Sequence, residues 1–328
     1  MPSPLVILVS LVFLIMPSPG NETWAAEKFP VKHIECIVAQ EAGADGDTIN
    51  RPVMSSASQI LGQPIMIVNK PGGGSALGYR ELHRAKADGY TVGWGSSTLI
   101  ANKLQGLSNI DHHDFTMLGA FATYFPVILA AKNTKRPFTT IQEVISFAKA
   151  HPGELSMATA WLGGAWWVAA MAFLRGTELE VNAIPTAGSG AMSVAQVAGG
   201  HTDLCIVALG AARSMVEAGQ VRILATLGEQ RLWPPYEQVP TVKELGYDVS
   251  YESPNFSLGP PNMPKPVVEI WVKAIKQAVD NPEFKQFCLE RGARWEYSPP
   301  DQVVAKLDKQ REVMRTIMGK AGILKESK

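Results

Sequence analysis

Short apolar runs alternate with helical segments along most of the chain, and Gly-containing turns separate several of them. Residues 33–38 are predicted to form a strand, which is followed by a Gly-rich turn and a helix over residues 48–61. This alternation is typical of an α/β protein with mainly parallel sheets. Thr140 is expected to cap a helix. The other expected strands are residues 64–69, 90–95, 125–131, 155–159, 180–184, 204–207 and 222–226, and the other expected helices are residues 79–87, 140–150, 165–174, 190–198 and 211–217, with a helical tail over 267–318 that is interrupted at about 292–300.

The composition indicates a folded globular protein. Of the 328 residues, 46% are hydrophobic and 18% are charged, which is too apolar for a disordered polymer. The 30 Lys and Arg residues are balanced by 30 Asp and Glu residues, so the chain lacks the basic excess of a nucleic-acid binder. We therefore expect no nucleic-acid partner. At about 100–200 residues per domain, the length predicts two domains.

The N-terminal residues differ from the rest of the chain. Residues 5–16 form an almost unbroken apolar run, which is shorter than the roughly 20 residues of a transmembrane helix. Pro and Gly residues follow the run, and the small Ala25 comes shortly after them. This pattern predicts a signal peptide over residues 1–25, with Ala26 as the first residue of the mature protein. An uncleaved anchor is the alternative, since no Lys or Arg precedes the run.

The cysteines are expected to be structural. Cys36, Cys205 and Cys288 are widely spaced and odd in number, and no C-x-x-C pattern is present. This spacing favours neither a zinc site nor a disulfide framework. Cys36 and Cys205 lie within predicted strands, where a free thiol packs as a small buried hydrophobe.

Three Gly-containing turns follow predicted strands and precede predicted helices. A helix N-terminus offers unpaired N–H groups and the positive end of the helix dipole, both of which favour an anion. In open α/β sheets, ligands bind beyond the carboxyl ends of the strands, so two or three of these turns could converge on one carboxylate. Alternatively, the glycines only tighten the turns. The three turns are residues 40–47, 159–165 and 186–190.

The signatures of common enzymes are not found. Residues 72–74 are three glycines without the Lys-Ser or Lys-Thr of a P-loop, and no G-x-S-x-G elbow is present. His112 and His113 are adjacent on a polar segment and are expected to be solvated rather than to bind a metal. No nucleophile with its base is recognisable. The sequence therefore predicts no catalytic residues, no metal and no cofactor.

A series of short motifs resembles the solute receptors of tripartite tricarboxylate transporters, the Bug-type periplasmic proteins. The resemblance covers about residues 29–321. Each motif is short, but their joint occurrence in one order and at nearly gapless spacing is specific. The motifs are NKPGGG at 69–74 with Gly78, ADGYT at 87–91, PG at 152–153, GGHTDL at 199–204, AGQVR at 218–222, VPTV at 239–242 with LG at 245–246, and PPNMPKP at 260–266.

The resemblance implies a two-lobed α/β periplasmic binding protein of type II, a Venus flytrap with a discontinuous first domain. Lobe 1 is expected to comprise residues 26–126 and 247–328, and lobe 2 residues 127–246. Such a receptor is monomeric and not an enzyme. It captures a small organic carboxylate in the cleft, through backbone N–H groups and bridging waters, and delivers it to membrane permease subunits. A ligand-sensing receptor for a membrane sensor protein is one alternative, and a cleft hydrolase or transferase is another.

The resemblance also implies where the ligand binds. In the family, the first Gly turn and the turn after the Pro-Gly segment hold a ligand carboxylate, and the loop after the third strand faces the cleft. The expected ligand-binding residues are Gln40, Glu41, Ala42, Gly43, Ala44, Asp47, Ser96, Ser97, Thr159, Ala160, Trp161, Gly163, Gly164, Ala165, Trp166, Thr186 and Val207.

The chain departs from the family pattern at positions that bear on the ligand. Trp161 and Trp166 stand where small or polar residues are usual, so at least one of them could stack on an aromatic or bulky carboxylate. Alternatively, both pack as core residues. Glu41 and Asp45 would repel a carboxylate. They are expected either to face outward or to accept hydrogen bonds from a hydroxyl or ammonium group of the ligand.

Overall fold

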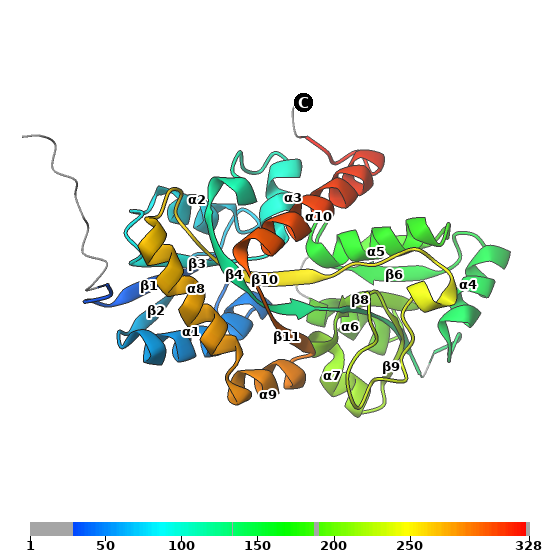
Figure 1. Cartoon of the computed structure of the whole chain (residues 1–328). Coiled ribbons are helices and arrows are strands. Elements are labelled where there is room, and N and C mark those ends of the chain that lie inside the picture. The colour runs from blue at the N-terminus through cyan, green and yellow to red at the C-terminus, as the bar shows by residue number, and fades with distance from the viewer. Residues whose placement is uncertain (1–28, 133, 187–189, 326–328) are drawn as a thin grey trace, which may run out of the picture.

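The computed structural model describes residues 29–132, 134–186 and 190–325, which form two lobes, each built around one β-sheet (Figure 1). The expected signal peptide over residues 1–25 lies outside the described residues. We call the lobe with the six-stranded sheet the first lobe and the lobe with the five-stranded sheet the second lobe. The expected two-lobed α/β architecture is confirmed.

The sheet of the first lobe has the strand order β11-β4-β10-β3-β1-β2. Strand β1 pairs in parallel with β2 and β3, whereas β10 runs antiparallel to β3 and β4, and β11 antiparallel to β4. The strands are β1 (Ile34–Val38), β2 (Ile65–Asn69), β3 (Thr91–Gly95), β4 (Thr116–Tyr124), β10 (Ser253–Gly259) and β11 (Ala293–Ser298), and the helices are α1 (Asp45–Leu61), α2 (Ala76–Arg84), α3 (Thr98–Leu104), α8 (Lys265–Val279), α9 (Pro282–Glu290) and α10 (Pro300–Lys320).

The sheet of the second lobe has the strand order β7-β6-β8-β5-β9. Strand β6 pairs in parallel with β7 and β8, and β5 runs antiparallel to β8 and β9. The strands are β5 (Pro126–Ala131), β6 (Ser156–Thr159), β7 (Asn182–Pro185), β8 (Leu204–Ala208) and β9 (Val221–Thr226), and the helices are α4 (Ile141–Ala150), α5 (Ala165–Gly176), α6 (Gly190–Ala198) and α7 (Leu209–Glu217).

The expectation of mainly parallel sheets is wrong, because both sheets are mixed. In each sheet, a strand that follows a crossing from the other lobe pairs in the antiparallel direction. These strands are β10, which pairs with β4, and β5, which pairs with β8. Strands β4 and β10 were not expected. The segment of β11 was recognised only as an interruption of a helical tail, although it pairs with β4.

The chain crosses between the two sheets at two places. Phe125 alone separates β4 of the first lobe from β5 of the second lobe. The chain returns through residues 227–252, which connect β9 to β10. In Figure 1, α10 runs along the top of the molecule from the first lobe toward α5 of the second lobe. The lobes are therefore joined by two chain crossings and by packing of the C-terminal helix.

Local sequence signals explain several of these elements. Thr140 caps α4 in a capping box, in which its hydroxyl accepts the Glu143 N–H and the Glu143 carboxylate accepts the Thr140 N–H. The expected Thr cap is confirmed. The three cysteines are free and buried, as expected. Burial raises the pKa of Cys36 to about 12, so this thiol is a packing group.

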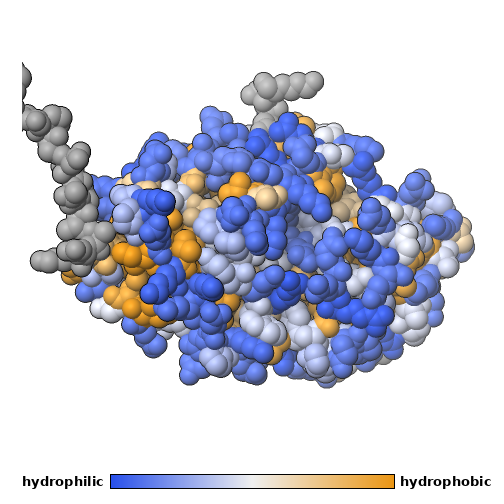
Figure 2. Space-filling model, viewed as in Figure 1, coloured by the Kyte–Doolittle hydropathy of each residue, from blue (hydrophilic) through white to orange (hydrophobic). Residues whose placement is uncertain are grey.

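The surface of the described part is mostly hydrophilic in the view of Figure 2, with a hydrophobic area over α8 of the first lobe. Among the described helices, none combines the length and the apolarity that crossing a membrane requires.

Candidate functional site

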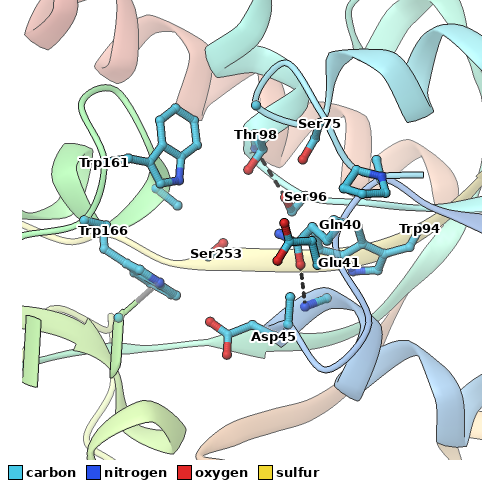
Figure 3. Close-up of a pocket in the computed structure, with 18 of the residues that line it drawn as sticks. Gln40, Glu41, Asp45, Ser75, Trp94, Ser96, Thr98, Trp161, Trp166 and Ser253 are labelled. Atoms are coloured by element: carbon cyan, nitrogen blue, oxygen red, sulfur yellow. Dashed lines mark hydrogen bonds between the residues drawn. The ribbon is translucent and has the colours of Figure 1, made fainter. Parts of the chain in front are cut away.

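A cavity of about 350 Å³ lies between the two lobes, a volume suited to a small molecule. Figure 3 shows side chains of both lobes pointing into it. The first lobe contributes Ala39, Gln40, Glu41, Ala44, Asp45, Gly46, Pro71, Gly72, Gly74, Ser75, Trp94, Ser96, Thr98, Tyr124, Ser253 and Asn255, and the second lobe contributes Ala160, Trp161, Ala165, Trp166 and Gly190.

The first Gly turn leads from β1 into α1 and is held together by its own side chains. The Gln40 side-chain oxygen accepts the Gly46 N–H at 2.8 Å, a bond drawn in Figure 3. The Asp47 carboxylate accepts the Gly43 N–H at 2.8 Å. Gly46 also packs closely on Trp94, since an added Cβ atom would lie 2.4 Å from the indole ring. Side chains of the turn therefore already occupy two of its backbone donors.

Asp45 is the first residue of α1, and its carboxylate points into the cavity toward Trp166 (Figure 3). Burial raises the pKa of this carboxyl, while Arg291 and the Trp166 indole act in the opposite direction. Glu41, by contrast, is exposed at the rim of the cavity. Thus one of the two acidic residues faces inward, and the other lies at the edge.

The second Gly turn leads from β6 into α5. Its Gly163 has a φ of +80°, a conformation that favours glycine. Helix α5 begins at Ala165, after Gly164 as its N-cap, and no side chain caps its N-terminus. Ala165 and Trp166, the first two residues of the helix, line the cavity. The N–H groups that an α-helix leaves unpaired at its start are therefore next to the cavity.

Aromatic rings form much of the cavity wall. Trp166 is 8% exposed and packs edge-on against Tyr124, with 6.3 Å between the ring centroids. Trp161 reaches across from the second lobe toward Gly74, whose added Cβ atom would lie 3.8 Å from the indole. Trp94 donates its indole N–H to the Asn255 side-chain oxygen at 3.0 Å. Trp161 and Trp166 line the cavity, and Trp166 also packs in the core.

Small hydroxyl groups lie among these rings. Ser253, at the start of β10, is 4% exposed, and its hydroxyl makes no hydrogen bond with the described residues. Ser96 accepts the Thr98 N–H at 3.3 Å. Figure 3 shows Ser253 at the back of the cavity, between the tryptophans of the second lobe and Gln40. The cavity therefore presents both hydroxyl groups and aromatic surfaces to a ligand.

The structure brings some of the expected site residues together at the cavity. Those that line it are Gln40, Glu41, Ala44, Ser96, Ala160, Trp161, Ala165 and Trp166. Those that do not line it are Ala42, Gly43, Asp47, Ser97, Thr159, Gly163, Gly164, Thr186 and Val207.

The side chains outside the cavity have other partners. The Asp47 carboxylate is bound by Arg51 and Asn69. The Ser97 hydroxyl donates to Gln310 at 2.8 Å, and the Thr186 hydroxyl donates to the Thr159 carbonyl oxygen at 3.0 Å. Of the third expected turn, residues 187–189 lie outside the described residues, and Gly190 lines the cavity.

Sequence reasoning missed most lining residues that come from strands. Trp94, Tyr124, Ser253 and Asn255 belong to β3, β4 and β10, of which only β3 was expected. For Trp94 a signal was available, because it lies two residues before Ser96, which was expected to face the cleft. The other three were hidden, because their strands have no alternating pattern. The glycines of residues 72–74 were considered as a P-loop and as part of a family motif, but not as site residues, yet Gly72 and Gly74 line the cavity.

One side-chain cluster away from the cavity has the composition of a metal site. The Nε2 atoms of His112 and His113 lie 2.9 Å and 2.7 Å from one carboxylate oxygen of Asp308 in α10. The expectation that both histidines are solvated is wrong for His112, which is buried. Burial lowers the pKa of His112, although Asp308 opposes this effect. These contacts attach α10 to the segment before β4.

Three comparisons place the chain among known proteins. The family described as tripartite tricarboxylate transporter family receptor matches residues 49–322. A UPF0065 protein in the gbd 5' region of Cupriavidus necator is 31% identical over 269 residues, which are 80% of this chain and 79% of the relative. BugT of Bordetella pertussis is 28% identical over 284 residues, 85% of this chain and 86% of the relative. The solved structure of R. palustris Rpa4515 with adipate has a TM-score of 0.78 and 25% identity, covering 90% of this chain and 99% of that protein.

Proposed function

Because the chain belongs to the tripartite tricarboxylate transporter receptor family, whose members are solute-binding receptors and not enzymes, we propose that it captures a small organic carboxylate in the cavity between its lobes. We propose the lobe boundaries expected from the sequence, with residues 26–126 and 247–328 forming the first lobe and residues 127–246 forming the second. The protein acts in the periplasm after removal of residues 1–25.

The uncapped start of α5 carries this proposal. Ala165 and Trp166 line the cavity, and no side chain of the described residues caps the N-terminus of this helix. An α-helix of 12 residues places the positive end of its dipole at this point. A ligand carboxylate at this position satisfies the unpaired donors and gains from the dipole. R. palustris Rpa4515, which was solved with adipate, supports carboxylates as the ligand class.

Contacts between the lobes support ligand capture by closure. Trp161 approaches Gly74. The Gln105 side chain packs against Gly163 so closely that a Cβ atom added to Gly163 would lie 2.4 Å from the Gln105 side-chain oxygen. Both contacts join the second Gly turn to the first lobe. A ligand that touches both lobes shifts an open and closed equilibrium toward the closed state.

The bound receptor delivers its ligand to the membrane permease subunits of a tripartite tricarboxylate transporter. Sensing is the second candidate role, because a closed receptor can also be recognised by a membrane sensor protein. Uptake of radiolabelled ligand by cells with and without the receptor gene separates the two roles. Transport predicts that uptake is lost with the gene, whereas sensing predicts that uptake persists once the permease is expressed independently.

The first experiment is thermal unfolding of the protein from Ala26 onward with aliphatic dicarboxylates and tricarboxylates, amino acids and aromatic acids. A ligand at about 100 times its dissociation constant stabilises the folded state by about 2.7 kcal/mol. We expect at least one carboxylate to raise the unfolding temperature. If none does so after retained ligand has been removed by refolding, the proposed function is wrong.

Two variants of Ala165 test the role of α5. Proline is tolerated at the first position of a helix, so Ala165→Pro removes one N–H group and retains the helix. We expect this change to weaken carboxylate binding by about tenfold or more, the effect of losing a hydrogen bond to a charged group. Ala165→Val keeps the N–H group and controls for added bulk. Equal affinities of the wild-type protein and Ala165→Pro would place the carboxylate elsewhere.

A further inference from the structure

The two walls of the cavity differ in charge. The wall formed by α5 offers unpaired N–H groups, whereas the wall formed by the start of α1 carries Asp45, with Glu41 at the rim. We propose that the ligand carries a cationic nitrogen in addition to its carboxylate, and that Asp45 and the neighbouring aromatic rings hold this nitrogen. This inference rests on the proposed function and specifies its substrate class.

The charges of the lining residues are the first argument. Among the described residues that line the cavity, Glu41 and Asp45 are acidic, and none is Lys, Arg or His. A dicarboxylate with one end at α5 would bring its other negative charge toward these acidic residues. Two like charges in a partly dehydrated site repel each other. A cationic nitrogen at the same place is attracted instead.

The surroundings of Asp45 are the second argument. No ion pair within the described residues includes this carboxylate, and the Trp166 indole is its neighbour in the cavity. Arg291, the cation that acts on it, is exposed to solvent. A carboxylate removed from water needs a nearby positive charge or several hydrogen bonds. Within the described residues, the Trp166 indole and the solvent-exposed Arg291 favour the charged form of Asp45, but burial outweighs them, and a ligand cation adds the missing charge.

The first Gly turn is the third argument. Its Gly43 and Gly46 N–H groups are already bound by Asp47 and Gln40, each at 2.8 Å. Neither α1 nor α5 has a side-chain hydrogen bond from its N-cap residue, but Gln40 already accepts the Gly46 N–H in the first turn of α1. The start of α1 therefore has fewer donors for a ligand carboxylate than the start of α5. The carboxylate of a zwitterion fits best at α5, which places its nitrogen toward Asp45.

The aromatic wall is the fourth argument. Trp166 and Tyr124 pack against each other beside Asp45, and Trp161 lies on the same side of the cavity as Trp166 (Figure 3). The faces of such rings attract cations, and the attraction is strongest where water is excluded. Rings next to an acidic group suit a bulky cation such as a quaternary ammonium or a pyridinium ring. The buried hydroxyl of Ser253 is free to bind another polar group of this ligand.

Pairs of ligands with the same shape and different charge test the proposal. Glycine betaine and 3,3-dimethylbutanoate differ only by N⁺ in place of carbon, and N-methylnicotinate and 3-methylbenzoate form a similar aromatic pair. Affinities are measured by titration calorimetry on protein freed of retained ligand. We expect the cationic member of at least one pair to bind about tenfold or more tightly than its neutral partner. The pair with the larger difference indicates whether the cation is aliphatic or part of a ring.

Substitution of the acidic residues assigns the effect. Asp45→Asn is expected to weaken binding of the cationic ligand by about tenfold and to change that of its neutral partner by less than about threefold. Glu41→Gln, a change at the exposed rim, gives a smaller effect in the same direction and serves if Asp45→Asn does not fold. Asp280→Asn removes one negative charge from an exposed position at the end of α8 and is the control.

Several results would overturn the proposal. One is equal or tighter binding of the neutral partner in both pairs. This includes the case in which binding of the neutral partner weakens with rising pH, as Asp45 loses its proton. Another is binding of plain dicarboxylates together with no binding of either pair. In both cases the proposed function stands, because a carboxylate still binds. If no carboxylate of any kind binds, the proposed function itself fails.

Discussion

Gly210 in α7 and Arg291 at the end of α9 touch through their backbones, although they belong to different lobes. A Cβ atom added to Gly210 would lie 2.2 Å from the Arg291 carbonyl oxygen. Nearby, the Arg213 guanidinium donates to the Glu290 carbonyl oxygen at 2.5 Å. The arrangement of the lobes around the cavity therefore depends on a residue without a side chain at position 210.

We expect Gly210→Ala to weaken ligand binding by about tenfold or more, because a methyl group that close to a backbone atom forces the lobes to shift. Calorimetric affinity and small-angle scattering with and without ligand measure the effect. Gly319→Ala in α10 is the control, since its added Cβ atom would lie 3.7 Å from Leu324, an ordinary contact. Wild-type affinity of Gly210→Ala would show that this contact does not control the cavity.

Three neighbouring tryptophans give a graded test of the cavity wall. Trp161 is half-buried at the cavity, Trp166 is buried and also lines it, and Trp167 is buried in the core away from it. We expect Trp161→Ala to reduce affinity with little loss of stability and Trp167→Ala to reduce stability alone. Trp166→Ala reduces both, because truncating a buried Trp costs about 3–5 kcal/mol.

The measurements for these variants are ligand affinity by calorimetry and the free energy of unfolding in urea. Affinities are compared at a temperature where all three variants are folded. Unchanged affinity in both Trp161→Ala and Trp166→Ala would assign the two rings to packing and would also remove the aromatic part of the substrate argument.

The helix cap at Thr140 gives a prediction about stability alone. The Thr140 hydroxyl accepts the Glu143 N–H at 3.2 Å, and α4 lies in the second lobe outside the cavity. Thr140→Ala is expected to lower the free energy of unfolding by about 1 kcal/mol, the usual cost of losing an N-cap. Thr140→Ser retains the hydroxyl and should restore most of the loss. A change in ligand affinity would contradict the separation of this cap from the cavity.

The sequence was sufficient to predict the elements that have turns at both ends. Strands β1, β2 and β6 are bounded by Gly, Pro or polar residues and were placed within one or two residues of their observed limits. Strand β10 was missed because its sequence is SPNFSLG, with polar and apolar residues mixed, although all seven residues are buried. Its burial results from the sheets and the cavity that surround it, which local sequence does not reveal.

The same limit applies to the cavity. Residues at the ends of predicted strands, such as Ser96 and Ala160, could be proposed from order along the chain. Tyr124 and Ser253 lie side by side because β4 and β10 pair in the antiparallel direction. This pairing joins segments more than 120 residues apart, so no local pattern brings their side chains to one place.

The final prediction concerns the pH dependence of stability through Asp47. Burial by itself would raise the pKa of this carboxyl, but hydrogen bonds from Arg51, Gly43 and Asn69 outweigh it and lower the pKa below its usual value. A group with a lowered pKa in the folded state stabilises the protein at pH values above its unfolded pKa, which is about 3.9. The stabilisation is lost as the pH falls through the folded pKa.

Asp47→Asn is therefore expected to destabilise the protein by about 1–3 kcal/mol at pH 7, because it removes a charged acceptor from three donors. The difference from the wild-type protein should decrease below about pH 4, where the carboxylate takes up a proton. Urea unfolding of both proteins from pH 3 to 7 measures this difference in the free energy of unfolding. Glu81→Gln is the control, since the Lys70–Glu81 pair is exposed and contributes about 0–1 kcal/mol. A difference that stays constant over this range would mean that the charge of Asp47 does not stabilise the first Gly turn.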